Sequence, residues 1–418
     1  MTRKAGFLSV LTAAVAATGI STGMAHAEKL VVWAGEQMSN PVVAEGWNKL
    51  KADFEAQNPG ITVEYMLPTG MIDNGAVQAA IQSDAGPDVL LTNSGLGRMT
   101  TVVKAKLVRP LTTYYEEHGW KDQIFPWLYD VLKGQFGGEI YEVPDGFDAI
   151  GLWYHKDLFE KNGWKIGGSW ADFEALLAKM KEAGIEPLVV GPRKGANGGH
   201  LAGNFFQAAA GTDAMGEVVR GKRPWTDAQP LLGAQRIADF VSKGYINQKM
   251  AGLDQDAATR MWVNKRAGIF FGGPWFITSA NTLGYDLNNL GYATIPSDVK
   301  GASIPTGGIG WSWMIPTSSK QPELAVKWLD FVLSDEIMRY RFEHPSGNTL
   351  RPRALEGAKP HIPVMAEVAA AAAGGIGYNP SVYIPGAALG TYYQVIQGLI
   401  GGQVSPQEGL AEIQAQIK

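Results

Sequence analysis

The order of apolar segments near the N-terminus constrains the fold more than any other feature of this 418-residue chain. A short apolar run over 30–33 predicts a buried strand, and apolar residues at steps of four, three and four predict a helix over 43–54. The sequence Asn-Pro-Gly at 58–60 ends that helix, and 61–66 predicts the next strand. A strand, a helix and a strand in this order indicate a largely parallel sheet in an α/β fold.

The same alternation begins again in the middle of the chain. An extended segment over 141–154 leads to a capping-box-like start at Ser169 and Asp172, and a helical stripe follows and ends near Gly184. The apolar run at 188–190 predicts another strand, and the Gly-rich stretch after it predicts a loop over 191–204. Because 418 residues are too many for one ordinary core, we expect two α/β lobes.

The first 27 residues have the features of a secretory signal peptide. Arg3 and Lys4 precede an apolar run over 7–20, and Ala-His-Ala at 25–27 resembles a cleavage site. The run is shorter than a membrane span, although an uncleaved anchor is the alternative. The chain has no Cys for a disulfide or for lipid attachment at the cleavage point. We therefore expect a periplasmic protein that starts at Glu28.

Charge and motifs exclude several classes of function. Loss of Arg3 and Lys4 with the leader changes the formal net charge from −4 to −6, which is no footprint for nucleic acid or anionic membrane. Walker A, H-E-x-x-H and G-x-S-x-G motifs are absent, and the His residues lack metal-ligand spacing. We therefore expect a binding protein with no catalytic residue, metal or cofactor. Asp145 and Asp148 leave a glycosidase open as the alternative, since such enzymes use two carboxylates.

Tryptophan is the most informative residue type, with 13 in the chain. Several occur next to Gly or Pro at predicted strand ends, where a side chain can face a cleft. Flat indole faces pack on the C–H groups of a sugar ring, while the hydroxyls need polar partners. We expect Trp275 and Trp311 to stack on a sugar. Trp33 and Trp313 fit either a site or a core, and Trp47 on a helical stripe fits a core.

Polar residues at the same strand ends are the candidate partners for ligand hydroxyls. Ligands of parallel sheets lie beyond the carboxyl ends of the strands, which brings the segments after residues 33 and 93 to one rim. The candidates are Glu36, Gln37, Asn93, Ser94, Asp145, Asp148, Gly308 and Arg351. An aromatic cage for a quaternary ammonium is less suited to so many polar groups. A glycerol phosphate would need a basic cleft, for which Arg193 and Arg351 are the visible donors.

The ordered set of segments resembles the maltose-binding-protein-like, family 1 extracellular solute-binding proteins. The resemblance covers nearly the whole mature chain, and no single piece is specific. It is carried by 30–33, 47–60, 87–89, 143–144, 152–159, 265–275, 307–308, 318–336 and 397–406. The family usually has Asn where His155 stands.

The resemblance implies a type II periplasmic binding protein fold, with a ligand cleft between two lobes joined by strand crossovers. The implied N-terminal lobe is 28–147 plus 306–345, and the C-terminal lobe is 148–305 plus 346–418, after a signal peptide at 1–27. The implied function is a monomeric sugar receptor that closes on a mono- or oligosaccharide and delivers it to the permease subunits of an ABC importer.

The resemblance also implies roles for single residues. Asp148 matches an acidic crossover residue, Trp275 matches a stacking Trp in Gly-Pro-Trp, and Glu36 and Gln37 match polar contacts after the first strand. Asn93 and the residue after it replace an acidic and aromatic pair of maltose receptors, which argues against maltose itself.

Overall fold

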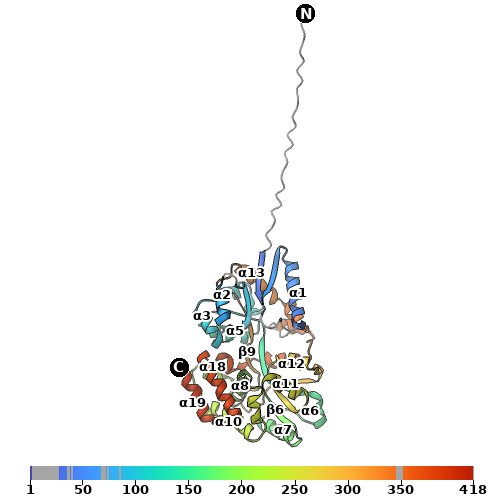
Figure 1. The fold of residues 1–418 in the computed structure, drawn as a ribbon, viewed down its shortest axis with the longest axis vertical. Coiled ribbons are helices and arrows are strands. Elements are labelled where there is room, and N and C mark those ends of the chain that lie inside the picture. The colour runs from blue at the N-terminus through green and yellow to red at the C-terminus, as the bar shows by residue number, and fades with distance from the viewer. Residues whose placement is uncertain are drawn as a thin grey trace.

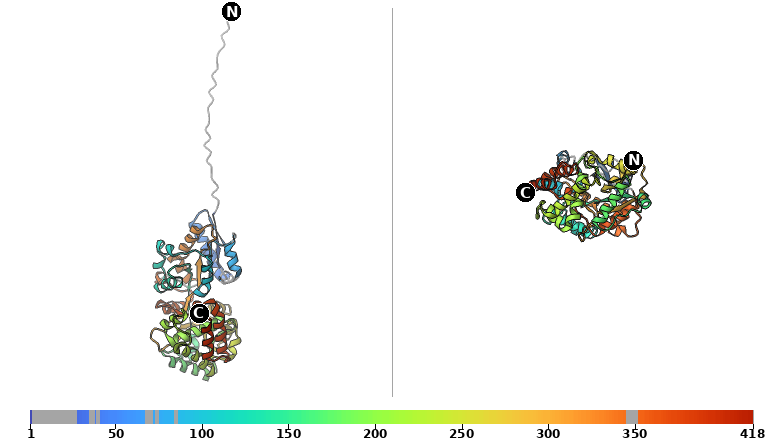
Figure 2. Two further views of the ribbon diagram at one scale, coloured as in Figure 1. Left: turned by 90° about the vertical axis from the view of Figure 1, so that its left-hand side faces the viewer. Right: turned by 90° about the horizontal axis from the view of Figure 1, so that it is seen from below.

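The computed structural model describes Met1 and residues 28–34, 38, 41–66, 72, 75–83, 86–344 and 352–417. Two lobes lie one above the other along the long axis of the molecule (Figure 1). A second view shows the same two bodies, with the C-terminus on the lower lobe (Figure 2). The predicted two-lobed α/β architecture is therefore confirmed. The predicted signal peptide, Glu36, Gln37 and Arg351 lie outside the described residues.

The first lobe is built on a five-stranded sheet with the order β2-β1-β3-β10-β4. Its strands are β1 (Glu28–Trp33), β2 (Ile61–Met66), β3 (Val89–Asn93), β4 (Val143–Pro144) and β10 (Trp311–Met314). β1 pairs in parallel with β2 and β3, as the strand-helix-strand pattern predicts, whereas β10 is antiparallel to β3 and β4. The helices of this lobe are α1 (Pro41–Gln57), α2 (Gly75–Gln82), α3 (Leu96–Lys104), α4 (Thr112–Glu117), α5 (Pro126–Gln135), α13 (Pro322–Val332) and α14 (Asp335–Glu343).

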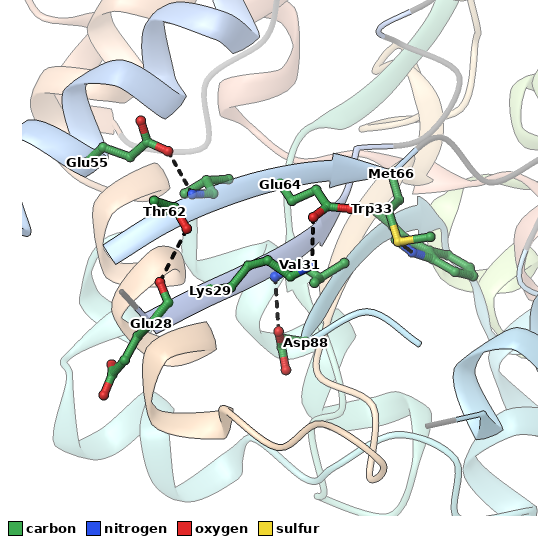
Figure 3. A network of polar contacts seen from close by, with 10 residues as sticks. Glu28, Lys29, Val31, Trp33, Glu55, Thr62, Glu64, Met66 and Asp88 are labelled. Atoms are coloured by element: carbon green, nitrogen blue, oxygen red, sulfur yellow. Dashed lines mark hydrogen bonds and ion pairs between the residues drawn. The ribbon is translucent and has the colours of Figure 1, made fainter. Parts of the chain in front are cut away.

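Side-chain contacts join the first strand to its neighbours (Figure 3). Asp88 Oδ2 accepts a hydrogen bond from the backbone N–H of Val31 at 3.0 Å, which ties the turn before β3 to β1. The indole N–H of Trp33 points to the sulfur of Met66, 3.3 Å away on β2. Trp33 is only 5% exposed and packs in the core of the lobe.

The second lobe is built on a sheet with the order β11-β9-β5-β7-β6, and β8 also pairs with β5. Its strands are β5 (Phe147–His155), β6 (Glu186–Val189), β7 (Ala267–Gly272), β8 (Leu290–Ala293), β9 (Thr306–Ile309) and β11 (Gly377–Tyr378). The long strand β5 pairs first with β9 and then with β7 and β8. Nearly all of β5 is buried, which explains its almost unbroken apolar sequence.

Helices pack around this second sheet. They are α6 (Lys156–Asn162), α7 (Trp170–Glu182), α8 (Ala196–Ala210), α9 (Thr212–Val219), α10 (Ala228–Ser242), α11 (Gln255–Val263), α12 (Phe276–Thr282), α16 (Val364–Ala373), α18 (Gly386–Ile400) and α19 (Pro406–Gln416). The predicted capping box of α7 is present, because Ser169 accepts from the N–H of Asp172 and the Asp172 carboxylate accepts in return. The stretch predicted as a loop over 191–204 is mostly the start of α8. Its glycines let the helix pack closely against its neighbours, as at Gly199 beside Tyr392.

Strands carry the chain between the lobes. β4 in the first sheet is followed at once by β5 in the second, and β9 returns through Gly310 to β10. The sheets therefore divide at Gly310, whereas the expected boundary at 306 would assign β9 to the first lobe. A last connection runs through α15 (Pro352–Leu355), which packs on α14, to α16 beside β8.

The lobes also touch beside these crossovers, where α3 packs against α17 (Pro380–Tyr383) and α18. Gly95 has a φ of 119°, and a Cβ on it would lie 2.7 Å from the carbonyl oxygen of Val382. A Cβ on Gly97 would overlap the carbonyl oxygen of Ile384. These glycines permit a backbone approach that larger residues would prevent. In the described ranges, no helix is long and apolar enough to cross a membrane.

Candidate ligand cleft

A cavity of about 450 Å³ lies where the two lobes and their crossovers meet. Its volume falls in the usual range for small-molecule sites. The first lobe contributes Asn93 and Arg98, and the crossovers contribute Asp148, Ile309, Gly310 and Trp311. The second lobe contributes Gly191, Lys194, Ala196, Asn197, His200, Asp254, Gln255, Asp256, Trp275, Ser381 and Val382. Residues of both lobes therefore line the cavity, and Asn93 at the carboxyl end of β3 is among them.

Trp275 stands just beyond the end of β7 and is partly exposed to the cavity. Gly273 permits its position, because a Cβ at residue 273 would overlap the indole ring. The indole N–H donates to Oε1 of Gln255 at 2.9 Å, and Nδ2 of Asn197 donates to the same oxygen at 2.9 Å. The His200 ring lies 5.3 Å from the indole and is tilted by 58°. The ring is thus held from behind and offers the cleft an apolar surface.

Trp311 and Asp148 come from the two antiparallel crossover strands. Trp311 begins β10 and is partly exposed, and its carbonyl accepts from the N–H of Asp145 at 2.8 Å. Asp148 pairs with Gly308 of β9, and its carboxyl group lies against Gly310, where a Cβ would come within 2.9 Å. Burial raises the pKa of Asp148 to about 6, and the Arg98 guanidinium opposes that rise.

Arg98 lies in the first turn of α3 and is partly buried at the cavity. Its Nη1 reaches the carbonyl oxygen of Ser94 at 3.4 Å, and its Nε is buried with no hydrogen-bond partner. Asn93 beside it uses Oδ1 to accept from the N–H of Ile72 and from the hydroxyl of Thr92.

His200 projects from the first turns of α8. Asn379 Oδ1 accepts from the N–H of Ser381 at 3.1 Å, so its Nδ2 is the group that donates to Nδ1 of His200 at 2.7 Å. This hydrogen bond assigns the imidazole hydrogen to Nε2. Burial lowers the pKa of His200 to about 4, and its ring is neutral near pH 7.

Four of the predicted site residues therefore line one cavity: Asn93, Asp148, Trp275 and Trp311. Gly308 is buried in β9 and faces Tyr383, while its neighbours Ile309 and Gly310 reach the cavity.

Other predicted site residues pack inside the protein instead. Trp313 is fully buried and contacts Trp47 at 5.6 Å between ring centroids, and its N–H donates to Asp145. Asp145 forms a buried two-pronged ion pair with Arg341, with N–O distances of 2.6 and 2.8 Å. Trp313 and Asp145 do not line the cleft, because the Asp145 carboxylate neutralises the buried charge of Arg341 and accepts the N–H of Trp313.

Ser94 and Trp33 also lie away from the cavity. The Ser94 hydroxyl is fully buried and donates to the carboxylate of Glu142. Trp33 lies in the core described above, where Met66 takes its N–H. Strand-end position alone therefore does not separate a cleft residue from a core residue in this sheet.

Sequence reasoning missed Arg98, Asn197, His200 and Gln255 as lining residues. Asn197 and His200 fall in the stretch taken for a loop, and Gln255 and Arg98 each lie in the first turn of a helix. A polar residue in the first turn of a helix, next to the carboxyl ends of the strands, is the sequence feature that could have predicted them. Within the described part of the chain, no cluster of three or more acidic or His side chains is arranged to hold a metal ion.

Two lobes, strand crossovers and a cavity lined from both sides define a two-domain solute-binding protein. The family model for bacterial extracellular solute-binding proteins matches residues 40–339, and the chain belongs to that family. An uncharacterised ABC transporter extracellular-binding protein of Pyrococcus horikoshii is 26% identical over 204 residues, which are 47% of this chain and 45% of the relative.

Two further proteins extend the comparison. The maltodextrin-binding protein MdxE of Bacillus subtilis is 27% identical over 263 residues, 55% of this chain and 60% of that protein. The sequence matches thus span about half the length of these curated relatives. A structure from work on xylan utilization by the thermophilic bacterium Caldanaerobius polysaccharolyticus superimposes with a TM-score of 0.79 at 20% identity, over 93% of this chain and 100% of that one. It shows that the fold is shared.

Proposed function

We propose that this protein is the periplasmic receptor of an ABC sugar importer, which binds a mono- or oligosaccharide in the cleft and delivers it to the membrane permease. The observation that carries the proposal is the position of Trp275 and Trp311 at one cavity together with Asp148. Indole faces suit sugar C–H groups, and a carboxylate suits sugar hydroxyls. The maltodextrin and xylan contexts of the similar proteins support the same class of ligand.

Ligand bound here would touch both lobes at once and would stabilise a closed state. Residues 1–27 would be the cleaved signal peptide, and the mature receptor would act as a monomer. The closed surface is what the permease subunits would recognise. Such a receptor performs no turnover and needs no cofactor.

A thermal-shift screen of mono- and oligosaccharides on the mature protein tests the proposal, followed by calorimetry on each ligand that raises the melting temperature. We expect at least one sugar to bind with a Kd that Trp275→Ala weakens. A glycoside hydrolase would instead release reducing sugar during the incubation. If no sugar of the screen raises the melting temperature, the proposal fails.

A further inference from the structure

Hydrogen bonds behind the cleft fix the direction of two amide side chains that line it. Gln255 uses its Oε1 for Trp275 and Asn197, so its Nε2 hydrogens are left for the cavity. Asn93 uses its Oδ1 for the backbone N–H of Ile72, and its Nδ2 is buried with no partner. Asn93 is only 4% exposed, and a buried amide nitrogen without an acceptor is costly. Gln255 therefore presents donors to the cleft, whereas Nδ2 of Asn93 is a buried donor behind its wall.

His200 and Arg98 add further donors. Asn379 occupies Nδ1 of His200, which leaves the Nε2–H of the ring as its remaining polar group. A guanidinium carries five N–H donors, yet Arg98 makes one long contact of 3.4 Å to the carbonyl of Ser94. Among the residues that the structure describes, Arg98 forms no ion pair within 4.0 Å, although its charge acts on the carboxylate of Asp148 in the same cavity.

The side-chain acceptors in the interior of the lining are Asp148, the Oδ1 of Asn197 and the hydroxyl of Ser381, which can also donate. Oδ1 of Asn197 remains for the cavity because both of its Nδ2 hydrogens are used. The carboxylate of Asp254 is taken up by an ion pair and by the N-terminus of α11. Asp256 and Lys194 are exposed at the rim.

The backbone also contributes N–H groups to the cavity. The first turns of the 15-residue helix α8 and of α11 line the cavity, and α8 has no side-chain cap. Helix N-termini carry partial positive charge and favour an anion. This partial positive charge adds to the donors of Gln255, His200 and Arg98.

We propose that the ligand is an acidic sugar, whose anionic group binds Arg98 and the surrounding donors while its hydroxyls bind Asp148. The inference rests on the proposed sugar-binding function and narrows its ligand class. A sugar hydroxyl accepts hydrogen bonds but also brings a hydrogen that needs an acceptor, whereas a carboxylate only accepts. The unused N–H groups of Arg98, Gln255 and His200 are therefore matched by an acceptor-only group, and hydrogen bonds to such a charged group are stronger than neutral ones.

Calorimetry on the mature protein tests this class of ligand. Hexuronates and diuronates are each compared with the neutral hexose or disaccharide of the same stereochemistry, at 150 mM salt in the same buffer. We expect the acid to bind roughly tenfold or more tightly than its neutral partner, because a charge-assisted hydrogen bond exceeds a neutral one. Glycerol 3-phosphate and a sulfonated hexose form two more arms that separate a carboxylate from other anionic groups.

Variants link the preference to one side chain. Arg98→Gln should bring the ratio of acid to neutral affinity close to one, and Arg98→Lys should keep part of it because the charge remains. Arg266→Gln is the matched control, since Arg266 is exposed beside β7 and does not line the cavity. Melting temperatures without ligand identify any variant that has not folded, and the Lys variant then carries the test.

The outcomes separate the two proposals. A neutral sugar that binds as tightly as its acid, or an Arg98→Gln variant that keeps the preference, overturns the inference and leaves the sugar receptor standing. Glycerol 3-phosphate that outcompetes every sugar acid overturns the carboxylate and sugar assignments together. Binding of no sugar of either kind overturns the proposed function itself.

Discussion

The indole nitrogen of Trp275 donates to Oε1 of Gln255 at 2.9 Å, across the wall of the cleft. The acceptor lies in the first turn of α11, and the ring follows the end of β7. Because Asn197 of α8 donates to the same oxygen, side chains of α8 and α11 together fix the acceptor of the indole N–H. The orientation of the ring is thus a property of the second lobe before any ligand arrives.

Loss of the Gln255 acceptor should leave the Trp275 indole present but less fixed in orientation. Gln255→Leu removes this acceptor and the Nε2 donor that faces the cleft, and should weaken sugar binding by about tenfold or more, in line with the loss of a hydrogen bond worth ~1–2 kcal/mol. Calorimetry gives the Kd. Gln403→Leu, at an exposed position beyond α18, is the control and should bind as the wild type does. If Gln255→Leu binds sugar with the same Kd as Gln403→Leu, Gln255 has no positioning role.

The two cleft tryptophans should carry much of the affinity. Trp275→Ala and Trp311→Ala should each cost roughly 2 kcal/mol of binding free energy or more, as expected for a buried aromatic anchor. Trp164→Ala serves as the control, because Trp164 is 8% exposed and packs on Phe159. The control should lower the melting temperature and leave the Kd unchanged. A Trp275→Ala protein with wild-type Kd would refute the stacking role.

Much of the fold could be predicted from the sequence, because apolar periodicity reports which face of an element is buried. The strands at 30–33 and 61–66 follow directly from such patterns, and the capping box follows from the spacing of Ser169 and Asp172. The boundary at 306 could not be placed, since β9 is a short Gly-rich strand that pairs with β5 and β11 of the second sheet but runs on through Gly310 into β10 of the first. Pairing of distant strands leaves little mark on local sequence.

The candidate site was predictable only in part. Trp275 follows the end of β7 and Trp313 lies within β10, yet the first lines the cleft and the second is fully buried. What separates them is the buried Asp145–Arg341 pair that takes up the N–H of Trp313, and its members are 196 residues apart in the chain. Arg98 could not be predicted as a lining residue, because it meets the other lining residues only when the second lobe packs against the first.

That buried pair should matter for stability rather than for binding. Arg341→Met leaves the Asp145 carboxylate buried and uncompensated, which should cost about 3–5 kcal/mol in free energy of unfolding. The double variant Asp145→Asn with Arg341→Met should recover most of that loss. Urea unfolding monitored by tryptophan fluorescence measures both. A single variant that unfolds like the wild type would contradict the assignment.

Asp148 should couple stability to pH in the protein without ligand. Its pKa rises from 3.8 unfolded to about 6 folded, so its stabilising contribution is complete below pH 4 and is lost as pH rises through 6. Asp148→Asn does not titrate. It should be more stable than the wild type by up to about 3 kcal/mol at pH 7 and equally stable near pH 4.

Urea unfolding of both proteins at several pH values between 4 and 7 measures the difference, which isolates Asp148 from His155 and His200. Those two histidines have pKa values lowered to about 4 by burial, and their stabilising contribution is lost as pH falls from 6.5. A difference between Asp148→Asn and wild type that does not change with pH would contradict the burial of this carboxylate. Asp148→Asn should also bind sugar more weakly. Asp148 would then lower the stability of the protein without ligand while it contributes to ligand binding.

Fluorine NMR of the protein labelled with 5-fluorotryptophan tests the central claim most directly. Single Trp→Phe variants assign the resonances of Trp275 and Trp311, and those of Trp225 and Trp262 serve as fully buried references. A saturating sugar should shift the two cleft resonances and leave the references in place. Binding that shifts the buried references while Trp275 and Trp311 stay unchanged would place the ligand elsewhere and contradict the account.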